Sequence, residues 1–496
     1  MKTRIRIRPI LFTAMLVVVL HGSNIRKSEA VESVLDLNDK WTGDFDGMVK
    51  RHLIRVLVPY SKTFYFLDGA HQRGITYEAL KEFEKYVNRQ LQKNTLKVRV
   101  IVIPTSRDRL LPALTEGLGD IAAGNLTTTP DRLKLVDFAD PGYTGVDEII
   151  VSGPKAPSIR TLDDLAGKEI YVRPSSSYHE SLVALNKGFK KSRKKPVKIV
   201  PVDEYVEDED ILEMMNVGLI PMTVIDSHKG TFWVQVFNNL KLHTDLKVRT
   251  GGETAWALRN NSPKLKEMIN GFVKTHKVGT LFGNILVNKY FKSTKWVRNS
   301  LTDEELRRFK QAVDLFQKYS GRYEFDWLMI AALAYQESRI DQSKRSPAGA
   351  IGVMQVLPST AADRNIAVPN IEKMEPNIHA GVKYLHFIRN RYFEAEPMDT
   401  VNKTLFSFAS YNAGPARVAD LRKEAAKAGL DANVWFRNVE IVAARRIGRE
   451  TVDYVGNIYK YYTAYRLIVD KLELKDKARR KLGGKSEEQL LNPSTP

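Results

Sequence analysis

The pattern of hydrophobic and polar positions changes character near residue 300. Before that point, short β-branched runs such as Leu53–Pro59 and Leu96–Pro104 alternate with segments whose apolar residues recur at helical spacing, such as Ile75–Gln92. Strands that alternate with helices are typical of an α/β domain with a largely parallel sheet. The alternation resumes after Arg160, so we predict that residues 51–291 form an α/β domain of two lobes.

The second half of the chain has almost only helical periodicity. A polar, basic stretch at 292–302 is predicted to be a linker, and residues 303–470 are predicted to form an all-α domain. The predicted helices are 303–319, 325–338, 359–365, 376–395, 400–410, 415–428 and 438–469. Residues 471–496 are charged and end in Asn-Pro-Ser-Thr-Pro, which predicts a disordered basic tail.

The first 30 residues have the pattern of a secretory signal peptide. Lysine and arginine precede an apolar run, Ile10–Leu20, that is too short to span a bilayer comfortably, and small residues follow at Ser28 and Ala30. We therefore expect export to the periplasm, with an uncleaved N-terminal anchor as the alternative. Residues 31–50 are polar and are predicted to be an irregular arm.

The length, charge and cysteine content of the chain limit its possible domain organisation, binding partners and catalytic chemistry. A chain of 496 residues is too long for one ordinary hydrophobic core. The 77 Lys and Arg outnumber the 58 Asp and Glu, a net charge of +19 that favours anionic surroundings. Export argues against nucleic acid and leaves an anionic wall polymer or peripheral membrane association. There is no cysteine, which excludes disulfides and thiolate sites, and no close His–carboxylate cluster predicts a metal or other cofactor.

One acidic residue of the helical half is a candidate catalyst. The segment Phe325–Ile340 leaves little polar surface, so this helix is predicted to be buried on most sides. Glu337 stands near its end and is either solvated or enclosed. If Glu337 is enclosed, desolvation raises its pKa, as general-acid catalysis near neutral pH requires.

Short motifs that follow Glu337 carry a family resemblance. They are Gly352–Gln355 (GVMQ), Ser410–Gly414 (SYNAG) and Glu450–Val455 (ETVDYV). Together with Glu337-Ser338, and in this order, they resemble the soluble-lytic-transglycosylase type of domain, which has a lysozyme-like fold. Two departures are mild and leave the acid in place: Ser410 stands where the family usually has Ala, and Val353 where Leu is common.

The resemblance implies a peptidoglycan lytic transglycosylase. Such an enzyme cleaves the β-1,4 bond between N-acetylmuramic acid (MurNAc) and N-acetylglucosamine (GlcNAc) and leaves a 1,6-anhydroMurNAc end. Glu337 would serve as general acid and then as base. The resemblance places substrate-binding roles on Ser338, Met354, Gln355, Tyr411, Asn412, Glu450 and Tyr454. Two alternatives stay open: a hydrolytic muramidase like goose-type lysozyme, and a solute-binding or sensor protein whose helical domain is inactive.

The N-terminal half resembles the family-3 solute-binding proteins through the segment Gly119–Pro141. That resemblance implies a regulatory ligand site made of Thr129, Arg132, Ser176 and Asp226. The arginine would bind an α-carboxylate, because its planar fork matches one, and Asp226 would pair with an α-ammonium. Pro221-Met222 replaces the usual Asp-Ala, which leaves the identity of the ligand open.

Both halves together, over most of residues 45–470, resemble the membrane-bound lytic murein transglycosylase F family. In that family the N-terminal domain is regulatory and the protein is usually peripheral at the outer membrane, facing the periplasm. The resemblance therefore implies regulation by a wall-derived peptide or amino acid.

Overall fold

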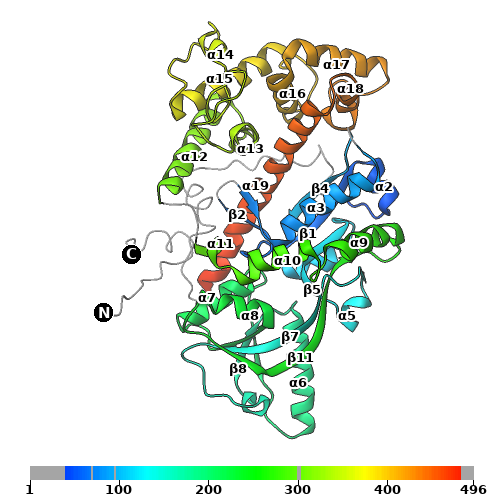
Figure 1. The fold of residues 1–496 in the computed structure, drawn as a ribbon, viewed down its shortest axis with the longest axis vertical. Helices are drawn as coiled ribbons and strands as arrows, with labels where there is room; N and C mark the ends of the chain where they lie inside the picture. Colours follow the sequence, from blue (N-terminus) through cyan, green and yellow to red (C-terminus); the bar gives the residue numbers. More distant parts are fainter. Residues whose placement is uncertain (1–38, 69–70, 94–95, 299–302, 482–496) are drawn as a thin grey trace.

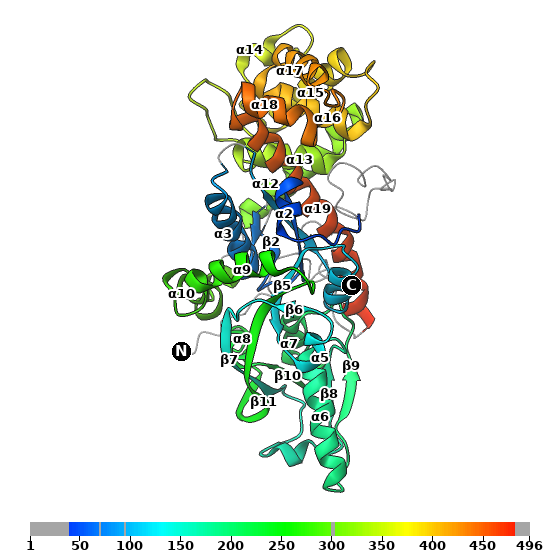
Figure 2. The same cartoon turned by 90° about the vertical axis from the view of Figure 1, so that its right-hand side faces the viewer.

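The computed structural model describes residues 39–68, 71–93, 96–298 and 303–481, and the molecule is elongated. Two α/β lobes occupy one end and a helical domain the other, and the long helix α19 connects them (Figures 1 and 2). The predicted signal peptide lies outside the described residues. Within the described part, none of the helices combines the length and the apolar character needed to cross a bilayer.

A seven-stranded sheet runs through both lobes in the order β10-β7-β11-β5-β1-β4, with β6 paired to β11. Its strands are β1 (Leu53–Val58), β4 (Arg99–Pro104), β5 (Ile121–Thr127), β6 (Asp137–Phe138), β7 (Tyr143–Ser152), β10 (Met222–Asp226) and β11 (Lys241–Leu258). Two small sheets pair β2 (Phe66–Asp68) with β3 (His71–Arg73), and β8 (Glu169–Val172) with β9 (Lys198–Pro201).

The helices of the lobes pack against these sheets or against one another. They are α2 (Phe45–Lys50), α3 (Ile75–Gln90), η2 (Arg107–Arg109), α4 (Leu110–Thr115), α5 (Pro130–Leu133), η3 (Leu162–Leu165), α6 (Ser177–Lys191), α7 (Asp208–Asn216), α8 (Ser227–Trp233), α9 (Pro263–His276), α10 (Leu281–Val287) and η4 (Asn288–Lys292). Helix α3 illustrates the cause: its apolar residues recur at helical spacing, so Tyr77, Leu80, Phe83 and Val87 are buried on one side.

The prediction of a largely parallel sheet is only partly right. Strand β1 pairs in parallel with β4 and β5, but β11 pairs antiparallel with β5 and β7, and β7 antiparallel with β10. The long strands β7 and β11 pass from one lobe to the other. The sequence pattern did not predict β11. Much of this strand is exposed, so it lacks the alternation of buried and exposed residues that indicates a strand.

The predicted all-α domain is confirmed as helical. After α11 (Lys295–Arg298) it contains α12 (Asp303–Tyr323), α13 (Trp327–Ser338), α14 (Pro358–Ala362), α15 (Met374–Tyr392), α16 (Thr400–Ala413), α17 (Pro415–Lys427), η5 (Trp435–Val439), α18 (Glu440–Arg446) and α19 (Arg449–Lys481). The single helix predicted at 438–469 is divided before α19, where Gly448 adopts a positive φ of 79°.

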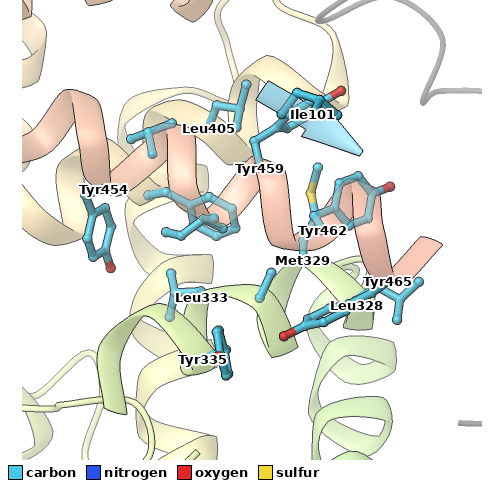
Figure 3. Packing of buried hydrophobic residues seen from close by; sticks show 14 of the residues in the cluster. Ile101, Leu328, Met329, Leu333, Tyr335, Leu405, Tyr454, Tyr459, Tyr462 and Tyr465 are labelled. Atoms are coloured by element: carbon cyan, nitrogen blue, oxygen red, sulfur yellow. The ribbon is translucent and has the colours of Figure 1, made fainter. Parts of the chain in front are cut away.

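Helix α13 is the most enclosed helix of the domain. Every residue from Leu328 to Tyr335 is buried, as its apolar composition predicts. Asp326 begins the helix by accepting the backbone N–H of Leu328, and left-handed Arg339 ends it. Figure 3 shows Tyr459 and Tyr462 of α19 packed over α13. This cluster also includes residues of β1 and α3, so one lobe and the helical domain share a hydrophobic core.

Three predicted irregular segments are in part helical. The linker predicted at 292–302 contains α11, and residues 299–302 lie outside the described part. The arm at 31–50 contains α2, whose first N–H is capped by the side chain of Asp44, while residues 31–38 lie outside the described part. The tail predicted to be disordered from residue 471 continues α19 as far as Lys481, and residues 482–496 lie outside the described part. The reason is tertiary: Ala478 and Arg479 are buried against the second lobe.

Candidate active site

Glu337 lies in the last turn of α13, where the helix positions its carboxyl group against the first turns of α19. The phenolic O–H of Tyr454 donates a hydrogen bond to Glu337 Oε1. Burial raises the pKa of Glu337 to about 7, although the hydrogen bond from Tyr454 acts in the opposite direction. A carboxyl group with this pKa is protonated in a substantial fraction of molecules at neutral pH, so it can donate a proton there.

The electrostatic surroundings of Glu337 are sparse. Apart from Tyr454, the charge that acts on its pKa is the cation of Lys344, which lowers it. Among the described residues, no second carboxylate perturbs the Glu337 pKa. Glycosidases of the usual kind pair their acid with a second carboxylate that activates water or attacks the sugar. The described groups that shift the Glu337 pKa therefore include no such partner.

The GVMQ loop is held next to Glu337 by side chains at the ends of α13 and α16. The hydroxyl of Ser338 donates to Val353 O at 2.8 Å, and the hydroxyl of Tyr411 donates to Met354 O at 2.8 Å. Gln355 has a positive φ of 47°, which turns the chain sharply at the end of the motif. These bonds fix the loop relative to Glu337, since Ser338 is its neighbour in the chain.

Sequence reasoning missed two residues that position this loop. The side chain of fully buried Asn377 accepts Met354 N–H at 2.8 Å and donates to Ile351 O at 2.7 Å. Gln342 accepts Val353 N–H at 3.2 Å. The available signal for Asn377 was weak: a lone amide at a core-facing position of α15, where polar residues are uncommon.

The remaining predicted substrate residues differ in their exposure. Met354 is buried, and Gln355 is half-buried with its amide donating to Gly352 O at 2.8 Å. Asn412 is exposed and accepts a hydrogen bond from Thr451 at 2.7 Å, which ties the end of α16 to α19. Glu450 is exposed. Contact of these side chains with a glycan stays a prediction.

The raised pKa of Glu337 predicts the pH dependence of the enzyme. If Glu337 is the general acid that we predict from the sequence, it must be protonated to act, so kcat/KM should be constant below pH about 7 and fall as pH rises through about 7. In Tyr454→Phe the carboxylate loses a stabilising donor, so the fall should move to higher pH. Initial rates on solubilised peptidoglycan between pH 5 and pH 9, in about half-unit steps, measure this. A fall at the same or lower pH in the variant would contradict it.

The second predicted site lies between the lobes. Arg132, Ser176 and Asp226 line a cavity of about 320 Å³, while Thr129 caps α5 behind it by accepting the N–H of Arg132. Ser176 caps α6 by accepting the N–H of His179. The guanidinium of Arg132 donates to Thr127 O and Ser175 O, both at 2.9 Å, so it connects the two lobes.

A lysine that the sequence did not reveal neutralises Asp226. Lys229 Nζ lies 2.8 Å from Asp226 Oδ2 and also contacts Asp208, which pairs in turn with Arg173. The other oxygen, Asp226 Oδ1, is buried without a hydrogen-bond partner among the described residues. Asp226 therefore already has a cation of the chain beside it, and its buried Oδ1 keeps one unused acceptor.

Comparison with known proteins assigns both halves. Residues 314–433 match the transglycosylase SLT domain, and residues 56–293 match the bacterial extracellular solute-binding proteins, family 3. A membrane-bound lytic murein transglycosylase F from Shewanella halifaxensis is 31% identical over 428 residues, covering 81% of this chain and 83% of the relative. The chain belongs to the membrane-bound lytic murein transglycosylase F family.

A second relative supports this membership. The membrane-bound lytic murein transglycosylase F of Desulfosudis oleivorans is 28% identical over 435 residues, covering 82% of this chain and 89% of the relative. Among solved structures, an ancestral arginine-binding protein bound to arginine matches at 23% identity and a TM-score of 0.40, covering 48% of this chain and 98% of its own. As a member of the lytic murein transglycosylase F family, the chain is a lyase acting on peptidoglycan, built from a two-lobed solute-binding domain and a helical SLT domain.

Proposed function

We propose that the helical domain cleaves the MurNAc-β-1,4-GlcNAc bond without water and leaves 1,6-anhydroMurNAc ends, with Glu337 as its one acid and base. The observation that carries the proposal is an enclosed carboxyl group with a pKa near 7 and no second carboxylate acting on it among the described residues. A hydrolase would need a second group to activate water.

The proposed reaction uses one proton twice. Protonated Glu337 donates its proton to the glycosidic oxygen as the C1–O bond breaks, so the GlcNAc side leaves with a hydroxyl. The resulting carboxylate removes the proton of the MurNAc C6 hydroxyl, and C6–O bonds to C1. Because this hydroxyl belongs to the same sugar, it acts at a high effective concentration and offsets the missing carboxylate nucleophile. Tyr454 stabilises the carboxylate between the two transfers.

Product analysis tests the proposal directly. Digestion of purified sacculi by the wild type should release muropeptides lighter by one water than those released by a muramidase, as measured by mass spectrometry. Products that carry the water would identify a hydrolase related to goose-type lysozyme. A wild type that gives no products, as Glu337→Gln also should, would instead favour a sensor whose helical domain is inactive.

We also propose that the solute-binding domain regulates cleavage when a wall-derived peptide or amino acid binds between the lobes. Lys229 already neutralises Asp226, so an α-ammonium group would have to compete with a cation of the chain, which favours an N-acylated peptide over a free amino acid. Helix α19 supports coupling, because it carries Tyr454 near one end and Arg479, paired with Asp210 of the second lobe, near the other. An N-acylated wall peptide at saturation that changed neither cleavage rate nor glycan affinity would contradict regulation.

We further propose that the protein works in the periplasm, associated peripherally with the outer membrane. Two observations support this placement: relatives of 27 to 31% identity are named membrane-bound, and the charge of the chain is strongly positive. Cations on a protein surface attract anionic membranes, and salt screens the attraction.

A further inference from the structure

The end of the second lobe carries a dense group of cations, which we call the basic tip. It comprises Lys168, Lys190, Lys191, Arg193, Lys194, Lys195 and Lys198. Two parts of the chain build it: the last turn of α6 with the turn that follows, and the paired starts of β8 and β9. Lys198 N–H donates to Lys168 O at 2.8 Å, and Lys194 N–H donates to Phe189 O at 2.8 Å, so both parts are held in one place.

The basic tip is not neutralised by its neighbours. The adjacent segment 161–169 contributes Asp163, Asp164 and Glu169, of which Asp163 pairs with Lys194 and Glu169 pairs with Lys198. The third, Asp164, accepts the backbone N–H groups of residues 160 and 161. The other five cations of the tip are exposed and have no ion pair with a described residue.

Helix stability explains only part of this charge. Lys190 and Lys191 lie in the last turn of α6, where cations stabilise the negative end of the helix dipole. That effect does not reach Lys168 or Lys195, which lie outside the helix, with the Lys195 stem running over Gly167. Holding unpaired cations close together costs free energy through repulsion, so their concentration here points to an anionic partner.

The position of the tip separates that partner from the glycan substrate. In both views α6 and β8 lie at the end of the molecule opposite the helical domain that contains Glu337 (Figures 1 and 2). A surface that served to hold the cleaved strand would be continuous with the catalytic site. A surface at the far end can instead be fixed to a support while the helical domain extends away from it.

We propose that the basic tip docks the protein on the anionic phospholipid surface of a membrane. Six of its seven cations are lysines, which bind phosphate groups as point charges without requiring a fixed geometry, as a fluid headgroup layer demands. The exposed lysines lie at the end of α6, in the turn that follows it and at the starts of β8 and β9, so we expect them to approach a flat surface together. Docking here directs Glu337 away from the bilayer, toward the wall. This inference rests on the proposed peripheral association and assigns it to one surface.

Vesicle co-sedimentation of the full-length chain tests the proposal. Vesicles with about one third phosphatidylglycerol in phosphatidylethanolamine should bind the wild type, with affinity falling as salt rises. The variant Lys168→Gln/Lys190→Gln/Lys191→Gln/Lys195→Gln should bind more weakly on the order of 10²-fold or more, since each cation at an anionic surface contributes about fivefold. Vesicles of phosphatidylcholine alone should bind neither protein.

The matched control removes the same charge elsewhere. The variant Lys373→Gln/Arg391→Gln/Lys427→Gln/Arg445→Gln changes four exposed cations of the helical domain and should bind anionic vesicles as the wild type does. Equal weakening in both variants would show an effect of net charge alone and overturn the assignment to the tip. A tip variant that keeps vesicle binding but loses sacculus binding would identify a wall polymer as the partner, which also overturns it. Failure of the wild type to bind anionic vesicles would overturn the proposed peripheral association. The proposed cleavage reaction is tested separately, by the anhydro products.

Discussion

Glu337→Gln should lower the rate of glycan cleavage by at least about 10³-fold while leaving the affinity for glycan strands almost unchanged. The amide keeps the shape and the burial of the side chain, and it can still accept the hydrogen bond of Tyr454. It cannot give up a proton, so the leaving oxygen would depart as an alkoxide. Release of soluble muropeptides from sacculi measures the rate, and co-sedimentation with sacculi measures binding.

Glu424→Gln is the matched control for this change. Glu424 lies in the same domain but pairs with Arg446 at the surface, where water and salt screen an ion pair and leave it weak. Its cleavage rate should stay within about twofold of the wild type. If Glu337→Gln kept more than a tenth of the wild-type rate, Glu337 would not be the group that supplies the proton.

Arg479→Met should lower the free energy of unfolding by about 3 kcal/mol, the second large effect. The guanidinium is buried, with Nη1 2.7 Å from Asp210 Oδ1 and Nη2 3.0 Å from Glu213 Oε2. Removing it leaves two carboxylates in a buried site, with the cation of Lys62 nearby. Urea unfolding at pH 7 measures the loss. The loss should shrink near pH 4, where protonation relieves the uncompensated carboxylates.

The neighbouring arginine supplies the control for this experiment. Arg480 lies beside Arg479 on α19 but is exposed, so Arg480→Met should change stability by less than about 0.5 kcal/mol. Equal midpoints for the two variants would show that the end of α19 is not held by the second lobe. A selective loss in Arg479→Met would mean that the helix bearing Tyr454 depends on contacts made at the lobe, as coupling of the two domains requires.

Local sequence patterns were informative wherever the determining interactions are themselves local. The apolar composition of α13 indicated a buried helix, and α13 is buried from Leu328 to Tyr335. The order of the short motifs identified the family and directed attention to Glu337, which the structure encloses as a raised pKa requires. Charge counts indicated an anionic partner but could not locate the cations, because a count carries no position.

Interactions between distant residues were decided by the tertiary structure. Tyr454 reaches Glu337 across 117 positions of sequence, and this pairing depends on how α19 crosses α13. Asn377 holds the GVMQ loop from another helix, and Lys229 neutralises Asp226 inside the lobe interface. The spacing of hydrophobic residues along the chain does not predict such contacts, because burial and charge pairing depend on neighbours in space.

The sequence by itself therefore determined the domain types, the helical nature of the second half, and the identity of the candidate acid. The tertiary structure alone decided the mixed sheet built on β7 and β11, and the helical course of residues 471–481 against the second lobe. A charged segment is predicted to be disordered when the residues that pair with its charges are unknown. Once Asp210 and Glu213 surround Arg479, their ion pairs and the burial of Ala478 offset the entropy of ordering the last turns of α19.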